Sequence, residues 1–303
     1  MSIYIKKIPL YRRIIRRLLV DTAILWNDEA FLKLFFWCSI GRVLNLNKPQ
    51  TFCEKINWLK IHHKRDFYTN LVDKIEVKEL LKKIISDDYI IPTIDVYDNV
   101  DEINFEKLPN QFVLKCSHDS GGIVICRNKD KLNINETRHK LNIGLRRNFF
   151  KFTREYPYKN VRPRIIAEVL LEDGNNSDLK DYKFFCFNGK ALYCQLISNR
   201  STRETVDFYD RNWEHQEFVG LTLANLHESK EQHPKPNGYE KMLEIADKLA
   251  AFVDCPFVRV DLYNVNGNIY FGEITFYPAS GMGAFYPDKW NYKIGDLIKL
   301  PNK

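Results

Sequence analysis

The sequence has 303 residues, of which 45% are hydrophobic, 14% aromatic and 28% charged. This apolar content supplies a core for one large domain or two ordinary ones, and it excludes an intrinsically disordered chain. The formal net charge of +7 (46 Lys and Arg against 39 Asp and Glu) favours polyanionic partners. Nucleic acid, anionic lipid and an acidic polysaccharide all fit that charge.

The cysteines and the N-terminus together predict a cytoplasmic protein. The 7 cysteines are far apart, mostly inside apolar runs and without CxxC or Cys/His metal spacing, which favours buried reduced thiols. Lysines at positions 6 and 7 precede an arginine-rich segment instead of an apolar core, so we expect no signal peptide. The most apolar stretch, Ala30–Ile40, is about half of the roughly 20 residues that span a bilayer.

Residues 10–20 predict a basic amphipathic helix. Steps of about 100° place four arginines on one arc and four apolar side chains on the opposite arc: Arg12, Arg13, Arg16 and Arg17 against Ile14, Ile15, Leu18 and Leu19. Such a helix suits attachment to an anionic membrane surface, where each Lys or Arg adds about 1 kcal/mol. The alternative is a helix packed on the domain with its arginines in solvent. The expected location is the cytoplasm, with attachment at the inner face of the membrane as the more specific hypothesis.

The remaining elements predict an α+β fold. Pro49 lies in a turn before a helix within residues 48–64, and apolar spacing predicts a helix over Leu71–Ile85. A small mixed domain follows, with a helix near 133–149 and strands at Tyr89–Tyr97, Phe112–Cys116, Gly122–Cys126 and Arg164–Leu171. Residues 181–276 are rich in strands, with a helix from Tyr239 to Phe252 and hairpin turns at Asn188-Gly189 and Asn266-Gly267.

The segment from Lys115 to Gly122, KCSHDSGG, which we call the flap, joins two predicted strands and could close over a phosphate. A glycine pair lets backbone N–H groups approach a phosphate, serine hydroxyls add donors, and a strand-borne lysine supplies a positive charge. The segment is not a Walker A or GxGxxG motif, and taken alone it is more often an ordinary hairpin than a phosphate site. His118 within it is better explained by hydrogen bonding than by catalysis, because no nucleophile is arranged beside it.

Asp261 and Glu273 flank the Asn266-Gly267 turn and form a candidate metal site. A two-residue turn would oppose position 261 to 272 and place the acids on different faces. A three-residue loop, or an equivalent bulge, would oppose 261 to 273 and bring the carboxylates within about 5.5 Å, where a cation relieves their repulsion. Oxygen ligands favour Mg²⁺ or Mn²⁺. Two exposed acids on separate faces remain the alternative.

Three further features have ordinary explanations as well as functional ones. Glu168 ends a strand-like run that could join two domains, and Asp181 and Lys183 alternate onto one strand face. The glycine-rich aromatic segment 276–285 follows Glu273 directly, where a substrate loop would lie. Exposed charges and a buried loop explain the same residues.

In order, these features resemble the ATP-grasp superfamily, and the segments resemble its TupA-like branch, named for teichuronopeptide biosynthesis. The similar segments cover the chain from about residue 45 almost to its end: NKPQTFCEKINWLKIH, FVLKCSHDSGG, DYKFFCFNGKAL, FVRVDLYNVNGNIYFGEITFYPASGMG and FYPDKWNYKIGDLI. The resemblance implies two α+β subdomains that clasp a nucleotide. It divides the chain into a helical N-terminal segment (1–70), N-terminal and lid subdomains with the phosphate flap (71–172), and a C-terminal subdomain with the metal site and substrate loop (173–303).

The resemblance also implies site residues and cofactors, namely ATP and Mg²⁺. Two lysines and the flap would hold the phosphates, namely Lys74, Lys115, Ser120, Gly121 and Gly122. Glu168 and the backbone of Val169 and Leu170 would bind the adenine, and Glu172 would bind the ribose. The implied metal ligands are Asp261, Glu273 and Thr275, and the implied catalytic residues are Lys183 and Arg259. Thr275 departs from the family pattern Glu-x-Asn, so the number of metal ions stays open.

The implied reaction is carboxylate–amine ligation through an acyl phosphate. The family context predicts an anionic, uronic-acid glycan or sugar nucleotide and an amino acid or amine as substrates, in cell-surface polysaccharide synthesis, and no nucleic-acid partner. The alternatives are a kinase-like phosphotransferase acting on a sugar or glycan and a non-enzymatic basic adaptor at the membrane. A glycosyltransferase is disfavoured because the chain has no Asp-x-Asp motif of the kind that binds a nucleotide-sugar metal.

Overall fold

The computed structural model describes residues 2–3, 8–119, 121–173, 178–221, 226–229 and 232–302. The helices in these ranges are α1 (Leu10–Asp21), α2 (Asp28–Ile40), α3 (Phe52–His62), α4 (Phe67–Val72), α5 (Glu76–Leu81), α6 (Ile134–Leu145), α7 (Phe149–Thr153), α8 (Tyr239–Val253) and α9 (Lys289–Asp296). Short 3-10 helices are η1 (Ala23–Leu25), η2 (Asp87–Tyr89), η3 (Val100–Glu102), η4 (Lys129–Lys131), η5 (Tyr156–Lys159) and η6 (Pro278–Gly281).

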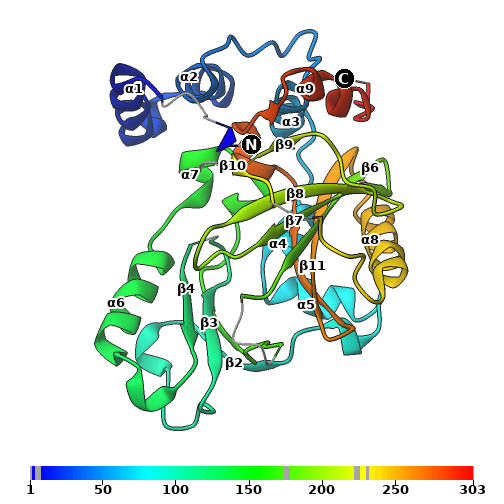
Figure 1. Cartoon of the computed structure of the whole chain (residues 1–303). Helices are drawn as coiled ribbons and strands as arrows, with labels where there is room; N and C mark the ends of the chain where they lie inside the picture. Colours follow the sequence, from blue (N-terminus) through cyan, green and yellow to red (C-terminus); the bar gives the residue numbers. More distant parts are fainter. Residues whose placement is uncertain are drawn as a thin grey trace.

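Two antiparallel sheets form the framework (Figure 1). The larger has the order β12-β11-β6-β7-β8, from Asn268–Thr275, Phe257–Val265, Asp181–Phe187, Lys190–Ser198 and Thr205–Asp210. The smaller, which we call the lid sheet, has the order β2-β5-β3-β4, from Thr93–Tyr97, Ile165–Glu168, Phe112–Cys116 and Ile123–Cys126. Short strands also pair: β1 (Ser2–Ile3) with β10 (Leu226–His227), and β13 (Phe285–Tyr286) with β9 (Val219–Gly220).

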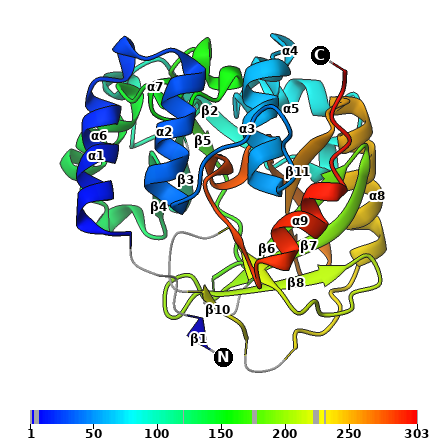
Figure 2. The ribbon, with the colours of Figure 1, turned by 90° about the horizontal axis from the view of Figure 1, so that it is seen from above.

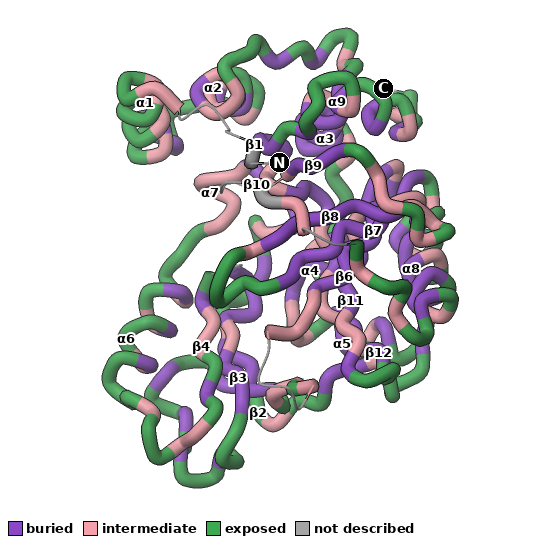
Figure 3. The backbone as a smooth tube through the Cα atoms, viewed as in Figure 1, coloured by how far each residue is buried: buried purple, intermediate pink, exposed green. Residues whose placement is uncertain are grey.

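Each sheet has its own hydrophobic core, and Figure 3 shows β6 and its neighbours in the large sheet as mostly buried. The large core includes apolar residues of the five-stranded sheet, of α8 and of the N-terminal helices α2 and α3. The lid core is smaller and joins β3 and β5 to α6, through residues such as Phe112, Leu141 and Ile165. Two cores built on two sheets place the structure in the α+β class, as expected.

The local patterns predicted from the sequence match many of these elements. Both two-residue turns connect antiparallel neighbours, β6 with β7 and β11 with β12. The helix expected from Tyr239 is α8, whose apolar face is buried against the large sheet. The helix expected within 48–64 is α3, which begins with a capping box: Thr51 accepts from the Glu54 backbone, and Glu54 accepts from the Thr51 backbone.

The expected unbroken helix over Leu71–Ile85 is wrong, because the chain leaves helical geometry between α4 and α5. Asp73 is extended (ψ 116°), its carboxylate accepts from the Ile75 N–H (2.9 Å), and it forms an ion pair with Arg164 of the lid (3.0 Å). These interactions of Asp73 take the place of backbone hydrogen bonds that a continuous helix would form here. The break directs Lys74, the residue between, toward the flap, where its N–H bonds to the Ser117 carbonyl (3.2 Å).

Three other expected elements have different ends. The strand expected from Tyr89 begins only at Thr93, because η2 and Pro92, which has no N–H to donate, come first. The strand expected over Arg164–Leu171 is shortened to Ile165–Glu168. The helix expected near 133–149 is α6, which ends at Leu145, and a separate helix, α7, begins at Phe149. The helix expected over residues 10–20 is α1, but Arg12 and Arg16 are half-buried against α2, so its arginines are not all in solvent.

Candidate active site

The β11–β12 hairpin sets the register of the two carboxylates singled out in the sequence. Its turn is the two-residue Asn266–Gly267 connection, and both turn residues have positive φ (54° and 91°). That turn alone would oppose position 261 to 272, but the register shifts just after Asp261, so that Asp261 lies opposite Glu273. The extra residue is Gly272, where a Cβ would lie 3.1 Å from the Asp261 carbonyl oxygen. A bulge therefore brings the two acids together.

Basic side chains converge on this pair. Arg259 donates to Asp261 from Nε (2.6 Å) and Nη2 (2.7 Å), and Nη2 also donates to Glu273 (2.9 Å). The same Nη2 lies 3.0 Å from Thr275 Oγ1. Lys183 of β6, directly opposite Asp261, forms an ion pair with its carboxylate. Both predicted catalytic residues and all three predicted metal ligands thus occupy one patch of the large sheet.

The two carboxylates differ in exposure and in pKa. The Asp261 side chain is 5% exposed, and burial raises its pKa although Arg259 and Lys183 act in the opposite direction. The Glu273 side chain is 40% exposed. Burial would raise its pKa too, but Arg259, Lys183 and Lys74 outweigh burial and hold the pKa at about 2. Glu273 is therefore ionised at neutral pH and accessible to a ligand.

The donor set of this patch fits a hard divalent cation. Asp261, Glu273 and Thr275 offer oxygen atoms only, and Mg²⁺ is usually bound by one or two carboxylates while phosphate oxygens and water complete its shell. Within the described ranges, no group of three or more His, Cys, Asp or Glu side chains could hold a metal. The residues thus suit Mg²⁺ that arrives with a nucleotide better than a closed site made by protein alone.

The lid sheet contributes a second charged cluster around Glu168. Lys115 of β3 lies 2.6 Å from Glu168, and Lys78 of α5 forms an ion pair with the same carboxylate. Burial would raise the pKa of Glu168, which is 3% exposed, but the two lysines outweigh burial and lower it. Lys78 also donates to the Ile91 carbonyl (2.7 Å). The residue expected to contact adenine is thus engaged by two lysines.

Lys74 lies between the two clusters. Its Nζ donates to the Asp119 carbonyl (2.6 Å) in the flap. Burial lowers the pKa of Lys74, and the charges that act on it come from Glu273 of the large sheet as well as from Lys115 and Glu168 of the lid. Lys74 is therefore close enough to both sheets to be acted on by the charge of Glu273 in the large sheet and of Glu168 in the lid.

The flap is held against α6 and the residues just after it. Arg147 pairs with Asp119 (2.9 Å), and its carbonyl lies 3.2 Å from His118 Nε2, consistent with a hydrogen-bonding role for this histidine. A Cβ at Gly121 would lie 2.6 Å from the Arg147 guanidinium, and one at Gly122 would lie 2.7 Å from the Cys116 sulfur. Ser120, also predicted to bind phosphate, lies outside the described residues.

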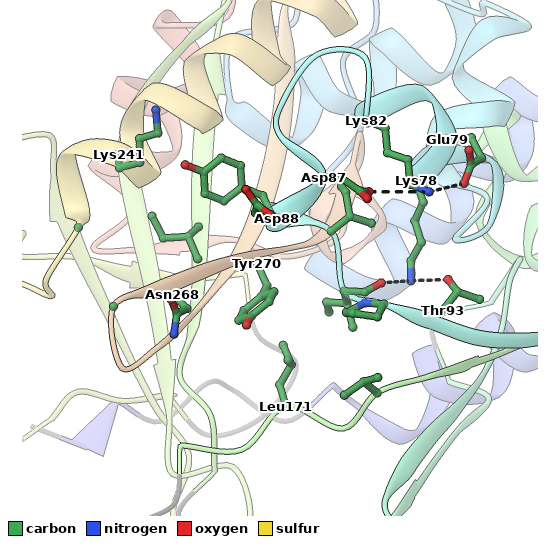
Figure 4. A pocket seen from close by; sticks show the side chains of 18 residues that line it. Lys78, Glu79, Lys82, Asp87, Asp88, Thr93, Leu171, Lys241, Asn268 and Tyr270 are labelled. Atoms are coloured by element: carbon green, nitrogen blue, oxygen red, sulfur yellow. Dashed lines mark hydrogen bonds and ion pairs between the residues drawn. The ribbon is translucent and has the colours of Figure 1, made fainter. Parts of the chain in front are cut away.

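The segment after β5 joins the lid sheet to the five-stranded sheet along the chain and borders a cavity. The Val169 N–H already bonds to the Pro92 carbonyl (3.1 Å), Leu170 is half-buried, and Glu172 pairs with Arg127 and accepts from Gln111 (3.1 Å). The cavity, of about 1020 Å³, is lined by Val169 and by residues from α5 and β12. Figure 4 shows Lys78 and Thr93 on one wall and Asn268 and Tyr270 on the other. The carboxylate pair does not line it.

A buried polar cluster beneath the 276–285 loop escaped the sequence analysis. Lys60, 1% exposed on α3, donates to the carbonyls of Thr153 and Ser280 (2.8 Å each). Ser280 in turn donates its hydroxyl to Glu155 (2.6 Å), which is 3% exposed. Burial raises the pKa of Glu155 and lowers that of Lys60. The one sequence signal was Asn57 and Lys60, polar residues three positions apart within the mostly apolar stretch 56–61 of α3.

Comparisons with known proteins give one matching family and several similar solved structures. The family model of the TupA-like ATP-grasp proteins matches residues 54–299. Among solved structures, the chain is similar to D-alanine–D-alanine ligase from Bacillus anthracis in complex with ATP (17% identity, TM-score 0.39, 68% of this chain and 53% of that one). It is also similar to L-amino acid ligase from Bacillus licheniformis (14% identity, TM-score 0.44, 85% of this chain and 57% of that one). A third similar structure is phosphoribosylamine–glycine ligase from Thermotoga maritima (13% identity, TM-score 0.44, 82% of this chain and 57% of that one).

This chain spans little more than half of the length of these three ligases, and every TM-score lies below 0.5. No curated protein is significantly similar to it. The family match, which extends over most of the chain, therefore assigns the fold. The chain belongs to the TupA-like ATP-grasp family.

Proposed function

We propose that this protein is an ATP-dependent carboxylate–amine ligase that forms ADP. The observation that carries the proposal is the Asp261–Glu273 pair, held in register by a bulge and surrounded by Arg259, Lys183 and Lys74. Two carboxylates suit a nucleotide-bound Mg²⁺, and cations beside them suit a phosphoryl group in transfer. The family match supports a nucleotide site, because ATP-grasp proteins are built around one.

The residues of this chain divide between the phosphates and the reacting groups. Lys74, Lys115 and the flap with Ser120, Gly121 and Gly122 would bind the phosphates, and the Leu170 backbone and Glu172 would face the nucleoside. Asp261, Glu273 and Thr275 would hold Mg²⁺, which when bound neutralises phosphate charge. Because Glu168 already binds two lysines, we assign it to holding Lys115 in position.

Arg259 and Lys183 would act on the transferring phosphoryl group and on the substrate carboxylate. A carboxylate oxygen attacks the terminal phosphorus of ATP and releases ADP, which gives an acyl phosphate. An amine then attacks the acyl carbon, and phosphate leaves as the amide forms. Both steps develop negative charge on phosphate oxygens, which the two fixed cations offset without reorganisation.

For the substrates, we propose a uronic-acid carboxyl group on a glycan or sugar nucleotide and an amino acid or other amine. The net charge of +7 supports an anionic substrate. A kinase-like phosphotransferase would use the same lysines and Mg²⁺ but would leave a stable phosphate ester. Hydroxylamine separates the two reactions, because it converts an acyl phosphate into a hydroxamate and leaves a sugar phosphate unchanged.

Thermal unfolding with and without Mg-ATP tests the nucleotide site without a known substrate. A ligand at 100 times its dissociation constant adds about 2.7 kcal/mol, which moves the midpoint by several degrees for a chain of this size. Asp261→Asn should lose most of the Mg-dependent shift. The matched control is Asp247→Asn, because Asp247 is also a mostly buried partner of basic residues (Arg211, 3.1 Å) but lies on α8. It should lower stability and keep the shift.

The proposal fails if wild type shows no Mg-dependent shift at millimolar Mg-ATP, or if Asp261→Asn keeps the full shift. With the nucleotide site established, uronic acids and amines would be screened in pairs for ADP release. Mass spectrometry of the product then distinguishes an amide from a phosphate ester. A phosphate ester would replace the ligase with the phosphotransferase while leaving the site assignment intact.

A further inference from the structure

Helix α1 packs on the protein with only part of its apolar surface. Leu19 is buried (3% exposed), Ile15 is half-buried, and Arg12 donates to the Trp37 carbonyl of α2 (3.1 Å). The face toward α2 is therefore a mixture of apolar and arginine side chains. Since an amphipathic helix normally buries its apolar stripe against its own domain, this orientation leaves part of that stripe without a partner among the described residues.

The exposed apolar stripe consists of Leu10, Ile14 and Leu18, which are 68%, 52% and 58% exposed. Their spacing of four residues places them one above another along a single face of the helix. The next turn continues the apolar surface, because Ile24 and Leu25 of η1 are 86% and 79% exposed. Large exposed apolar side chains grouped in one short segment mark an interaction surface, whereas scattered ones do not.

Arginines border this stripe. Arg13 and Arg17 are exposed, and on the helical wheel they lie about 60° and 20° from Leu10, on the side away from Leu18. Arg16 follows on the same side and is half-buried. The one acidic residue of α1 is Asp21, at its C-terminal end. The exposed half of the helix thus presents an apolar strip with a basic margin.

This surface has a defined position at the edge of the molecule. Figures 1 and 2 both show α1 outermost, with α2 between it and α3. Arg154 holds the turn that follows α1 by bonding to the carbonyls of Ala23 and Trp26 (3.3 Å to the latter). The stripe is therefore presented outward by a helix that is itself anchored, and no refolding is needed for it to meet a flat surface.

We propose that the stripe of Leu10, Ile14 and Leu18, together with η1, binds the surface of an anionic lipid bilayer. The apolar side chains would enter the boundary between headgroups and acyl chains, and Arg13 and Arg17 would lie among anionic headgroups. With 12 residues and a length of about 18 Å, α1 would lie in the plane of the surface. No helix in the described ranges is long and apolar enough to cross a membrane.

Two observations favour lipid over a protein partner. The charged side chains beside the stripe are arginines except for Asp21 at the C-terminal end of α1, and this basic excess suits an anionic surface, whereas protein interfaces usually mix signs. The half-exposed Trp26 (38%) at the end of η1 adds an amphipathic ring of the type that collects at membrane–water boundaries. A second copy of this chain would instead place these arginines against one another.

Vesicle co-sedimentation of the full chain tests the apolar part of the proposal. Wild type should bind vesicles of phosphatidylcholine with phosphatidylglycerol, and Ile14→Ser/Leu18→Ser should bind at least tenfold more weakly. The matched control is Ile125→Ser/Ile143→Ser, which removes two lid side chains of similar exposure (55% and 49%) and should bind like wild type. Retention of the Mg-ATP thermal shift in both variants shows that folding and the nucleotide site are unaffected.

A charge variant tests the basic margin. Arg13→Gln/Arg17→Gln should weaken binding to the anionic vesicles by about 30-fold, at about 1 kcal/mol for each basic side chain. Pure phosphatidylcholine should discriminate little between this variant and wild type. The control is Lys131→Gln/Lys140→Gln, which removes two exposed charges of the lid and should leave binding unchanged.

The proposal is overturned if wild type stays in the supernatant with anionic vesicles, or if the Ile14/Leu18 variant binds as tightly as wild type. It is also overturned if analytical ultracentrifugation finds a wild-type dimer that the same serine variant converts to a monomer, because the stripe then belongs to an interface between copies. Failure of the nucleotide proposal would leave all three results unchanged.

Discussion

Replacement of Glu168 by Gln should destabilise the protein strongly. The Glu168 side chain is 4% exposed, and its carboxylate pairs with Lys78, whose side chain is 9% exposed, and with Lys115, whose side chain is 19% exposed. Glutamine keeps the size but removes the charge that compensates two largely buried ammonium groups. Removal of one partner from a buried ion pair costs about 3–5 kcal/mol. At about 2 °C for each kcal/mol in a chain of this size, the midpoint should fall by about 6–10 °C.

The assay is urea and thermal unfolding of wild type, Glu168→Gln, Lys78→Met and the double variant at neutral pH. Lys78→Met leaves Glu168 paired with Lys115, so its cost should be smaller. The double variant removes both the charge and one of its unpaired partners, so it should recover at least 1 kcal/mol relative to the sum of the single variants. A loss below 1 kcal/mol in Glu168→Gln, together with additivity in the cycle, would refute this electrostatic account.

Three further predictions follow from side chains elsewhere. The pKa of Glu273 is lowered from 4.5 to about 2, so its stabilising effect should be present above pH 4.5 and disappear as the pH falls toward 2. In urea unfolding, the free energies of wild type and Glu273→Gln should differ by about 1–2 kcal/mol above pH 4.5 and converge near pH 2; the difference is this small because the side chain is 40% exposed. Gly295→Ala should lower the midpoint more than Lys293→Ala in the same helix, since its Cβ would lie 2.3 Å from the Gln50 carbonyl oxygen, and equal midpoints would contradict that packing. Glu155→Gln should lower the rate of ADP release more than it weakens the Mg-ATP thermal shift, because Glu155 supports the 276–285 loop through a hydrogen bond; equal losses of both would place it at the nucleotide instead.

Local sequence patterns were sufficient for the elements whose cause is local. The hairpin turns follow from Asn-Gly pairs that accept positive φ, and α1 and α8 follow from the 3.6-residue apolar period. The order of the candidate site residues from Lys74 to Glu273, together with five short similar segments, was likewise enough to predict the family. Each of these features depends on residues close together in sequence or on a characteristic order of short segments.

Site geometry needed the tertiary structure. The turn at Asn266–Gly267 is compatible with two registers, and only pairing of the whole hairpin places the bulge at Gly272 and Asp261 opposite Glu273. The apolar period across 71–85 predicted a continuous helix, but the bond from Asp73 to Arg164, 91 positions away, competes with the helix and breaks it. Turn chemistry and periodicity carry no information on such distant partners.

The environment of each charged residue was also decided by packing. Glu168 is a strand-end acid in the sequence and the partner of two lysines in the fold, while Lys60 and Glu155, 95 positions apart, become a buried cluster. The helical wheel of residues 10–20 established that α1 is amphipathic, yet the direction it faces depends on where α2 lies. Sequence therefore determined which faces and charges exist, and the tertiary structure decided which of them meet, because burial and electrostatic pairing act between residues that only the folded chain brings together.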